Sequence, residues 1–591
     1  MRQVVERFET PESSRARFGG KGFFLTKLRD MHYAVPPFRI LESAVLDRHD
    51  IPEREVEELL AALRAEAAEV MGVDPASVAF AVRSSAPVSM PGMMDTLLGV
   101  GISPADVPAL AERLGGAGTA WDMVITGARG LCRHIAGIET DEAEQATFDT
   151  YARLVAAFEG ATGREFPGTP VAQVKLAVDA VAASWNNQRA REYRAVHGIS
   201  EQDRPSVVIQ AMAYGTAGSS SGSGVVFSHD PLTGVRGLHG EFLGERTGES
   251  LVAGTATPAA VQQLAAAVPT AHAELTAYTD ELFSWLSVMV EVEFVVEHGT
   301  LWLVQVRPAI AADQVHNTVA VDAWRAGILD RAEALRRLRL DALFAEAPPC
   351  AVAGHAPLLA TGIAASTGVA TGRLVRDSAA ALDGGPEATV LLRPRTEPED
   401  FMGMVHAVAV VTLEGGSGSH AAVVARELGR PAVVGAVFTD PDWLARAGAA
   451  TVTVCGTTGR VWLGAVPLAE GGMAGWPGDL IGAPEDTEVL GSAEDLFGAE
   501  PEAVQLDPAT DPARIPASAI VVTDDPQLAA AAARYAGVAF VCPPGDAETP
   551  WRTDLPEIPL RYVIAAPAQQ RYVRAVLALR ETITSRSEAS R

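Results

Sequence analysis

A single histidine follows a run of small residues in the segment T-L-E-G-G-S-G-S-H-A-A-V-V-A-R-E-L-G-R-P-A-V-V-G, residues 412–435. The preceding glycines and serines leave backbone N–H groups unobstructed, and the pattern after them predicts a helix over 421–428 that stops at Gly429. His420 is therefore expected in the first turn of that helix. There the helix dipole lowers an imidazole pKa, and free N–H groups stabilise an anion on the ring. The arrangement predicts an uncharged, reachable imidazole that can carry a phosphoryl group. The alternative is a tight strand-to-helix connection in which the histidine is only a cap.

Two further segments contain residues whose types and spacing suggest a binding site. In F-G-G-K-G-F-F-L-T-K-L, residues 18–28, the glycines let backbone approach a phosphate and Lys21 offers a point charge, although a turn before a helix has the same appearance. In E-V-E-F-V-V the carboxylates of Glu291 and Glu293 are two residues apart. On a strand they point to one face and could hold Mg²⁺, whereas the alternative is a solvated strand edge.

The elements that must position these groups follow from the apolar pattern. The 591 residues are too many for one core and predict three to four domains. Strands are predicted at 78–82, 207–209, 291–296 and 301–306, with a mostly helical insert at about 120–197. A helical connector follows and ends at Pro348-Pro349, a natural hinge because consecutive prolines cannot continue a helix.

The C-terminal half changes character. Short β segments at 389–393, 407–412 and 432–434 predict a compact β/α domain over 359–463. Residues 470–516, rich in Gly, Pro, Asp and Glu, are interpreted as a linker with at most one helix. The tail is predicted to contain strands at 519–522, 538–542 and 560–565, a helix at 526–536 and a last helix from Ala568.

Composition excludes several function classes. Acidic residues outnumber basic ones by 74 to 47, a net charge of −27, and no basic stripe compensates, which disfavours a nucleic-acid or membrane partner. The four cysteines are far apart and indicate neither a disulfide framework nor a zinc site. No signal peptide or long apolar segment is found, so a cytoplasmic protein is expected.

Residues 415–431 resemble the phosphohistidine signature of the PEP-utilising enzymes, which include pyruvate phosphate dikinase, phosphoenolpyruvate synthase and rifampin phosphotransferase. Their pattern G-G-x-x-S-H-A-A-[VI]-x-A-R-x-x-G-x-P is matched from Gly415 to Pro431, with Arg426 in place. The resemblance extends to L-A-T-G-I-A-A-S-T-G-V-A-T-G and R-P-R-T-E-P-E-D-F, and implies a swivelling phosphohistidine β/α domain. Gly418 replaces the threonine that the dikinases carry there, so regulation by phosphorylating that threonine is not available.

The N-terminal segments 18–28, 80–98, 207–234 and 291–308 resemble the ATP-grasp domain of pyruvate phosphate dikinase. This resemblance implies an ATP site with Mg²⁺ on the two glutamates, although the family has aspartate at position 291. An arginine pair of the dikinases is missing from 120–126, so phosphate-acceptor chemistry is less secure than ATP binding. The residues implied to bind nucleotide or take part in transfer are Lys21, Arg83, Gln210, Met212, Gln305 and Arg307.

The expected architecture is an α/β multidomain protein. It comprises an ATP-grasp-like domain with a helical insert (1–310), a helical connector (311–355), the phosphohistidine domain (356–465), and an acidic linker with a small α/β tail (466–591). A full C-terminal (β/α)₈ barrel, which binds pyruvate or PEP in the dikinases, needs about 250 residues. The tail is too short for one, although 522–544 resembles one βαβ unit of it.

The resemblance implies that His420 attacks the β-phosphorus of ATP, leaving AMP and a pyrophosphoryl-histidine whose terminal phosphate passes to phosphate or water. Three hypotheses remain open. The first is a complete phosphotransferase whose tail, alone or in a homodimer, binds a small-molecule acceptor. The second is a phosphocarrier subunit that serves a partner protein with the PEP/pyruvate site. The third is a non-catalytic nucleotide-binding regulator, against which the intact His420, Lys21 and Arg83 argue.

Overall fold

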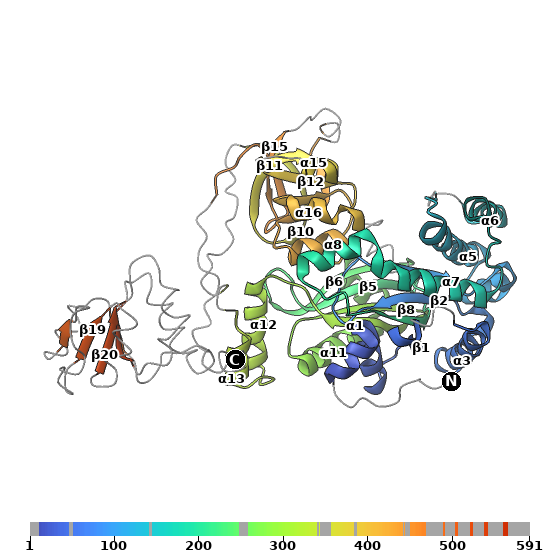
Figure 1. Ribbon diagram of the computed structural model, residues 1–591, viewed down its shortest axis with the longest axis horizontal. Helices are drawn as coiled ribbons and strands as arrows, with labels where there is room; N and C mark the ends of the chain where they lie inside the picture. Colours follow the sequence, from blue (N-terminus) through green and yellow to red (C-terminus); the bar gives the residue numbers. More distant parts are fainter. Residues whose placement is uncertain are drawn as a thin grey trace. The chain divides into compact units, whose positions relative to one another are not determined.

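The computed structural model describes residues 11–46, 51–140, 145–246, 258–339, 356–382, 387–440 and 450–468, the single residues 342 and 443, and five strands between 488 and 564 (Figure 1). The chain forms two compact units. The first contains residues 1–312 and 348–471, and the second contains 313–347 and 472–591.

A four-stranded antiparallel sheet lies at the centre of one hydrophobic core of the first unit. Its order is β1 (Phe38–Leu41), β4 (Ser206–Ala211), β2 (Phe80–Ser85) and β3 (Thr96–Val100). The strands predicted at 78–82 and 207–209 are confirmed as parts of β2 and β4, with ends that differ by one to three residues. Helix α3 (Glu53–Met71) packs Val56, Leu60, Leu63 and Ala67 into this core, the spacing of one helix face.

A second antiparallel sheet has the order β7 (Ala259–Ala260), β6 (Arg236–Gly244), β5 (Gly222–His229), β8 (Val290–Glu297) and β9 (Thr300–Pro308). The strands predicted at 291–296 and 301–306 are confirmed as β8 and β9. The core on this sheet is completed by α1 (Pro11–Asp30), α10 (Gln262–Ala267) and α11 (Pro269–Leu286).

The predicted helical insert is also confirmed. It contains α5 (Ala117–Leu131), a turn of π-helix (Cys132–Ala136), α6 (Phe148–Thr162), α7 (Pro170–Ala183) and α8 (Gln188–His197). The shorter helices before it are α2 (Ser43–Leu46) and α4 (Val107–Leu114).

The β/α domain predicted over 359–463 is a closed barrel of seven strands, in the order β10-β14-β13-β12-β11-β15-β16. The strands β11 to β14 pair in parallel, and the other pairs are antiparallel. The strand predicted at 389–393 is confirmed residue for residue as β12. The barrel's elements are β10 (Leu358–Ser366), β11 (Val369–Val375), α15 (Ser378–Leu382), β12 (Thr389–Arg393), α16 (Phe401–His406), β13 (Ala409–Thr412), α17 (His420–Glu427), β14 (Ala432–Phe438), β15 (Thr451–Cys455) and β16 (Arg460–Leu463).

The second unit contains α12 (Asp313–Arg325) and α13 (Arg331–Arg337), as the helical connector predicted, and a five-stranded parallel sheet. The sheet order is β17-β21-β20-β19-β18. The predicted tail strands are confirmed as β19 (Ile520–Thr523), β20 (Gly537–Val541) and β21 (Leu560–Ile564).

The interpretation of 470–516 as a linker with at most one helix is wrong, because β17 (Glu488–Leu490) and β18 (Ala503–Gln505) lie in it and form the two edges of this sheet. The hinge at Pro348-Pro349 and the helices at 526–536 and from Ala568 lie outside the described residues.

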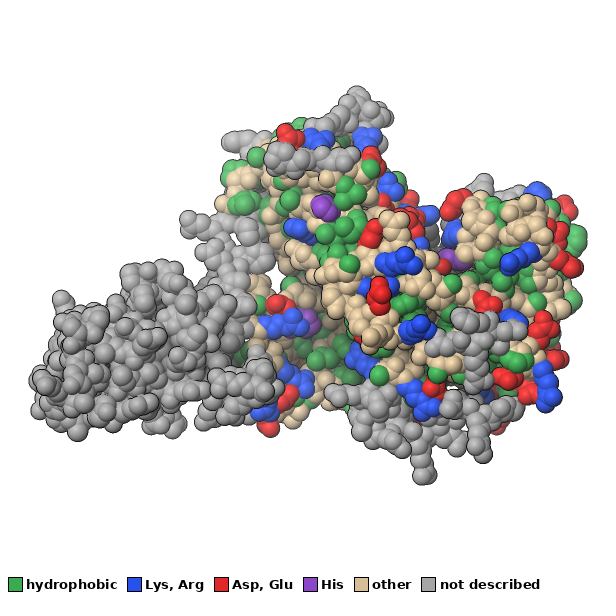
Figure 2. Space-filling view, viewed as in Figure 1, with side chains coloured by type: hydrophobic (Ala, Val, Ile, Leu, Met, Phe, Trp, Pro, Cys, Tyr) green, Lys and Arg blue, Asp and Glu red, His purple; other side chains and the backbone are tan. Residues whose placement is uncertain are grey.

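Two properties of the described surface bear on partners. Basic and acidic side chains are interspersed on the face shown in Figure 2, where the described residues form no continuous basic stripe. Among the described helices, none combines the length and apolar character needed to cross a bilayer.

Candidate active site

The Gly-Lys-Gly segment lies inside α1, where it contacts the end of β2. Helix α1 is interrupted at Gly19, which has φ 69° and ψ 175°. A Cβ on this residue would overlap the Ser85 carbonyl, so the close approach requires glycine. Gly20 N then donates to Ala86 O at 2.8 Å, and Lys21 Nζ donates to Ser84 O at 3.0 Å. The glycines therefore bring Lys21 to the C-terminal end of β2, an inner strand of the first sheet.

Arg83 joins the two sheets. It projects from β2, and its Nη2 donates at 2.9 Å to Glu293 Oε2 on β8 and to Gln305 Oε1 on β9. Its Nη1 donates to Val304 O at 2.9 Å and to Gln210 Oε1 at 3.3 Å. The guanidinium of Arg83 thus contacts three other residues predicted to bind nucleotide or metal, Gln210, Glu293 and Gln305.

Arg307 and Glu291 form the adjacent pair, directly opposite each other on β9 and β8. Arg307 donates to Glu291 Oε1 from Nε at 2.9 Å and from Nη2 at 2.6 Å. The other carboxylate oxygen, Glu291 Oε2, is buried and has no hydrogen-bond partner among the described residues. Arg307 Nη1 also donates to Ser89 Oγ at 3.2 Å, in the loop that follows β2.

The electrostatics of this cluster favour a polyanion. Burial, together with the positive charges of Arg83 and Arg307, lowers the pKa of Lys21 to about 7, against the opposing effect of Glu293. Lys21, Arg83 and Arg307 therefore lie close together in a partly buried site. Arg83 and Arg307 are already paired with Glu293 and Glu291, so a phosphate group would mainly stabilise the charged form of Lys21.

The lowered pKa predicts proton-linked nucleotide binding. Because the nucleotide phosphates favour the charged lysine, ATP binding should take up about half a proton at pH 7, and the Kd should rise up to about tenfold per pH unit above pH 7. Calorimetry in buffers of different ionisation enthalpy measures this uptake. Lys21→Arg, which stays charged, is the matched control because it retains only the nucleotide's own titration. Equal proton uptake by the two proteins would contradict the prediction.

The lowered pKa of Lys21 also determines how its charge affects the stability of the folded protein. Its pKa in the folded protein lies below the unfolded value of 10.5, so the unfolded chain binds more protons between these values. The lysine charge therefore destabilises the fold below about pH 7, and this penalty disappears as the pH rises from about 7 toward 10.5.

Met212 is not brought into this cluster. Its sulfur accepts a hydrogen bond from Gly99 N at 3.2 Å, and its carbonyl accepts from Arg113 Nη2 at 3.1 Å. The side chain packs at the edge of a separate apolar cluster around Tyr214 and Leu110. Its predicted nucleotide contact stays a prediction.

His420 is the first residue of α17, one residue earlier than the predicted start, and Gly429 ends this segment with φ 62°. The expectation of an unshielded ring is wrong. His420 is only 9% exposed, and it packs against Gly92 of the loop after β2, where a Cβ would lie 2.7 Å from Nε2. Burial, rather than the helix dipole alone, lowers the pKa of His420 to about 4, against Asp400 and Glu399, which raise it. The ring is neutral at pH 7, as predicted, but because it is buried.

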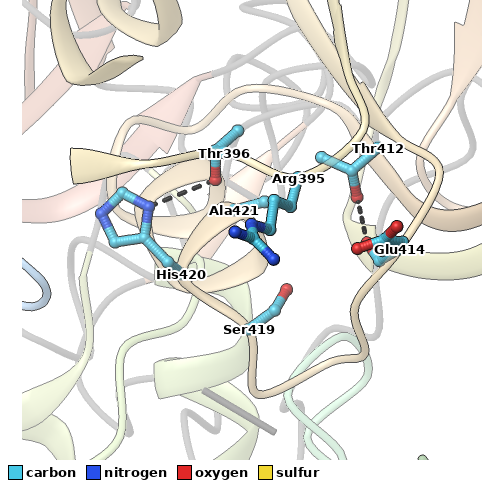
Figure 3. Close-up of a pocket in the computed structure, with 7 residues that line it drawn as sticks. All are labelled: Arg395, Thr396, Thr412, Glu414, Ser419, His420 and Ala421. Carbon is cyan, nitrogen blue, oxygen red and sulfur yellow. Dashed lines mark hydrogen bonds between the residues drawn. The ribbon is translucent and has the colours of Figure 1, made fainter. Parts of the chain in front are cut away.

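The surroundings of the ring are polar. His420 lines a small pocket of about 170 Å³ with Arg395, Thr396, Thr412, Glu414, Ser419 and Ala421 (Figure 3). Thr396 Oγ1 lies 3.2 Å from His420 Nδ1, whereas the buried Nε2 has no hydrogen-bond partner among the described residues. The nitrogen that faces Gly92 is thus the one whose bonding capacity is unused.

The glycine-rich loop before His420 is held by a carboxylate that the sequence did not reveal. Glu241 of β6 accepts hydrogen bonds from Ser417 N and, at 3.3 Å, from Gly418 N. A Cβ on Gly416 would overlap the same carboxylate. The sequence predicted that these loop N–H groups stabilise an anion on the His420 ring, but in this structure two of them are occupied by Glu241. Arg426 fixes the loop from behind by donating to Ser417 O at 2.9 Å.

Helix α8 completes the contact between the barrel and the N-terminal part of the chain. Arg189 is ion-paired with both Asp95 and Glu399, and the Tyr193 hydroxyl donates to Glu427. One apolar cluster contains residues from both sides, among them Met90, Met93, Met94 and Trp185 with Phe401, Met404 and Ala421. The three methionines thus belong to a hydrophobic core that two parts of the chain share. Charged residues such as Arg189 and Glu241 give no sequence signal of such contacts.

The side chains present fit ATP and a divalent cation. Lys21, Arg83 and Arg307 supply the positive charge, and the partnerless Glu291 Oε2 is a free oxygen ligand. Within the described ranges, no group of three or more His, Cys, Asp or Glu side chains forms a cation site. Because Mg²⁺ usually keeps several water ligands, a cation there would complete its coordination with water or nucleotide oxygens.

Comparisons with known proteins agree with this geometry. Residues 41–272 match the family model described as pyruvate phosphate dikinase, AMP/ATP-binding domain, and residues 385–459 match the PEP-utilising enzyme, mobile domain. The first match includes Arg83 and Glu241, and the second includes His420 and Thr396. These matches define a nucleotide-binding protein that also has a histidine-bearing domain of the PEP-utilising type.

The chain belongs to the family of PEP-utilising enzymes related to pyruvate phosphate dikinase. It is 32% identical over 527 residues to pyruvate, phosphate dikinase of Rhizobium meliloti, with 80% of this chain and 58% of the relative covered. It is 31% identical over 523 residues to pyruvate, phosphate dikinase 2 of Oryza sativa, with coverage of 80% and 58%. The Giardia intestinalis enzyme is 32% identical over 527 residues, with coverage of 79% and 58%. The chain thus spans less than two thirds of the length of these relatives.

Proposed function

We propose that this protein is an ATP-dependent phosphotransferase in which His420 takes a phosphoryl group from bound nucleotide and passes it to an acceptor. The observation that carries the proposal is the position of His420. Its partnerless Nε2 faces Gly92, in the loop that continues from the strand carrying Arg83. In this reading the N-terminal part is an ATP-grasp domain and the barrel is a swivelling carrier, with the domain boundaries expected from the sequence.

Lys21, Arg83 and Arg307 hold the phosphates and stabilise the negative charge that develops during transfer, which is the main catalytic task in phosphoryl transfer. Glu291 and Glu293 would hold Mg²⁺, which neutralises phosphate charge when it is bound. The lone pair on His420 Nε2 attacks phosphorus, the P–O bond breaks, and its electron pair stays on the departing nucleotide oxygen. By analogy with the dikinases the attack is at the β-phosphorus and leaves AMP, and the terminal phosphate of the pyrophosphoryl-histidine passes to phosphate or water.

Positional labelling tests this reaction. Wild-type protein incubated with magnesium and ATP labelled at the β-phosphorus should acquire an acid-labile, base-stable label and release AMP. Label from the γ-position should leave the protein when phosphate or water accepts it. Samples with EDTA or without magnesium serve as controls. A protein that stays unlabelled with both nucleotides would exclude the proposal.

The acceptor is proposed to be a small molecule bound by this chain, with a partner protein that supplies the acceptor site as the alternative. Chasing the labelled protein with pyruvate separates these. Transfer to pyruvate by the purified chain supports the first reading. A label that leaves only when a second protein is added supports the phosphocarrier reading.

A further inference from the structure

The barrel contributes a polar group to His420 that the proposed reaction does not yet use. Thr396 lies between β12 and the 3-10 turn η5 (Pro398–Asp400), and its side chain points to the imidazole (Figure 3). Its Oγ1 is 3.2 Å from Nδ1, and Thr396 is only 5% exposed. Water therefore has little access to this side of the ring, and the threonine hydroxyl takes its place.

The two ring nitrogens have different surroundings, and this difference identifies the proton's position. Nε2 is buried without a partner, and a buried N–H donor left unpaired is rarer and more costly than an unpaired acceptor. A lone pair is therefore favoured on Nε2, which places the proton on Nδ1. The Thr396 oxygen then accepts the Nδ1–H hydrogen bond.

We propose that Thr396 is a positioning residue for His420: it accepts the Nδ1–H hydrogen bond, keeps the lone pair on Nε2, and stabilises the protonated ring from which the phosphoryl group later departs. This inference rests on the proposed function for its catalytic meaning. Thr396 and His420 belong to the same closed barrel, so their hydrogen bond accompanies the histidine wherever the barrel travels.

The hydrogen bond to Thr396 would favour both the phosphorylation of His420 and the later transfer of its phosphoryl group. When Nε2 attacks phosphorus, the ring becomes cationic, and its remaining N–H is a stronger donor to the threonine oxygen. On departure, the P–Nε2 bond breaks and its electron pair returns to Nε2, while an acceptor oxygen forms the new bond to phosphorus. A protonated ring leaves as neutral imidazole, whereas an unprotonated one would leave as an anion. Holding the Nδ1 proton therefore makes the phosphohistidine a better donor.

Other charged groups surround the ring and are retained when Thr396 is changed. Glu399 and Asp400 of η5 favour its protonation, and Arg189 of α8 opposes it. Arg395 and Glu414 line the same pocket. Replacing threonine by valine alters none of these charges and keeps the side-chain volume. Its effect then reports the hydroxyl.

The first test reads the tautomer without nucleotide. Nitrogen-15 NMR of the full chain with labelled histidines, assigned with His420→Asn, should show Nδ1 protonated and Nε2 unprotonated in the wild type and in Thr396→Ser. Thr396→Val should shift the population toward the Nε2–H form. An Nε2–H ring in the wild type, or an unchanged tautomer in the valine variant, would overturn the proposal even if ATP labelling succeeds.

The second test uses phosphoramidate, a chemical phosphoryl donor, so that it does not depend on reaction with ATP. The phosphohistidine formed in the wild type and Thr396→Ser should lose phosphate to water with the same pH profile. In Thr396→Val, loss of one hydrogen bond to a charged ring should move that profile about one pH unit lower and slow the loss at pH 7 about tenfold. Thr412→Val, in the same pocket but bonded to Glu414 O, is the matched control. Superimposable profiles for the two valine variants would refute the assignment.

Discussion

Replacing His420 with asparagine should abolish the acid-labile label, with a loss of at least about 1,000-fold, because the variant has no nitrogen at the position of Nε2. Asparagine reaches as far as Nδ1 and can still form a hydrogen bond with Thr396, so the barrel should keep its fold. The measurement is the initial rate of protein labelling from ATP with magnesium.

The control for this variant is His406→Asn, on the exposed end of α16 in the same barrel. It changes the same residue type without touching the ring, and should label at the wild-type rate. A label that survives in His420→Asn at more than a few per cent would assign the phosphoryl group to another residue.

Replacing Gly92 with alanine should slow phosphorylation of His420 about 100-fold while ATP binding is retained. The new Cβ would overlap the imidazole and lie 2.7 Å from Nε2, so the ring must move away from its place beside the loop after β2. A displacement of about 1 Å at a reacting group can cost about 100-fold in rate. The variant should therefore lower the labelling rate at saturating ATP and leave the Kd for ATP unchanged.

Backbone strain must be separated from this overlap, because Gly92 has φ 72° and alanine disfavours that region by about 1–2 kcal/mol. Gly72→Ala is the matched control. Gly72 has φ 70° at the end of α3, but a Cβ there meets nothing within 4 Å. Both variants carry the same strain, and only one displaces the histidine. Equal labelling rates in the two would show that the docked position of His420 is not the one used in the reaction.

Much of the fold was predictable because its strands correspond to local runs of apolar residues. The apolar runs that became β2, β4, β8 and β9 are continuous enough to be recognised, and β12 was found residue for residue. The strands β17 and β18 were missed because three residues are too few to show a period, and they lie in a stretch rich in helix and strand breakers.

The site was predictable where chemistry coincided with local sequence. Lys21, Arg83 and Arg307 stand beside glycines or in strands, and the structure brings them together, with Glu291 and Glu293 as their counterions. The burial of His420 was not predictable, because it arises from contact with Gly92, a residue far earlier in the chain. Glu241 was missed for the same reason, since a lone glutamate on a strand gives no sign of the loop it will bind.

The apolar cluster of Met90, Met93, Trp185, Phe401 and Met404 should make separation of the barrel depend on temperature. If the barrel separates from the N-terminal part of the chain, these side chains become exposed to water. The separated state then has a higher heat capacity. Separation should then become easier on cooling, because hydrophobic attraction weakens at low temperature. If the barrel acts as the proposed carrier, its second site must therefore offer a similar apolar surface, or the barrel must be exposed to water only briefly between the two sites.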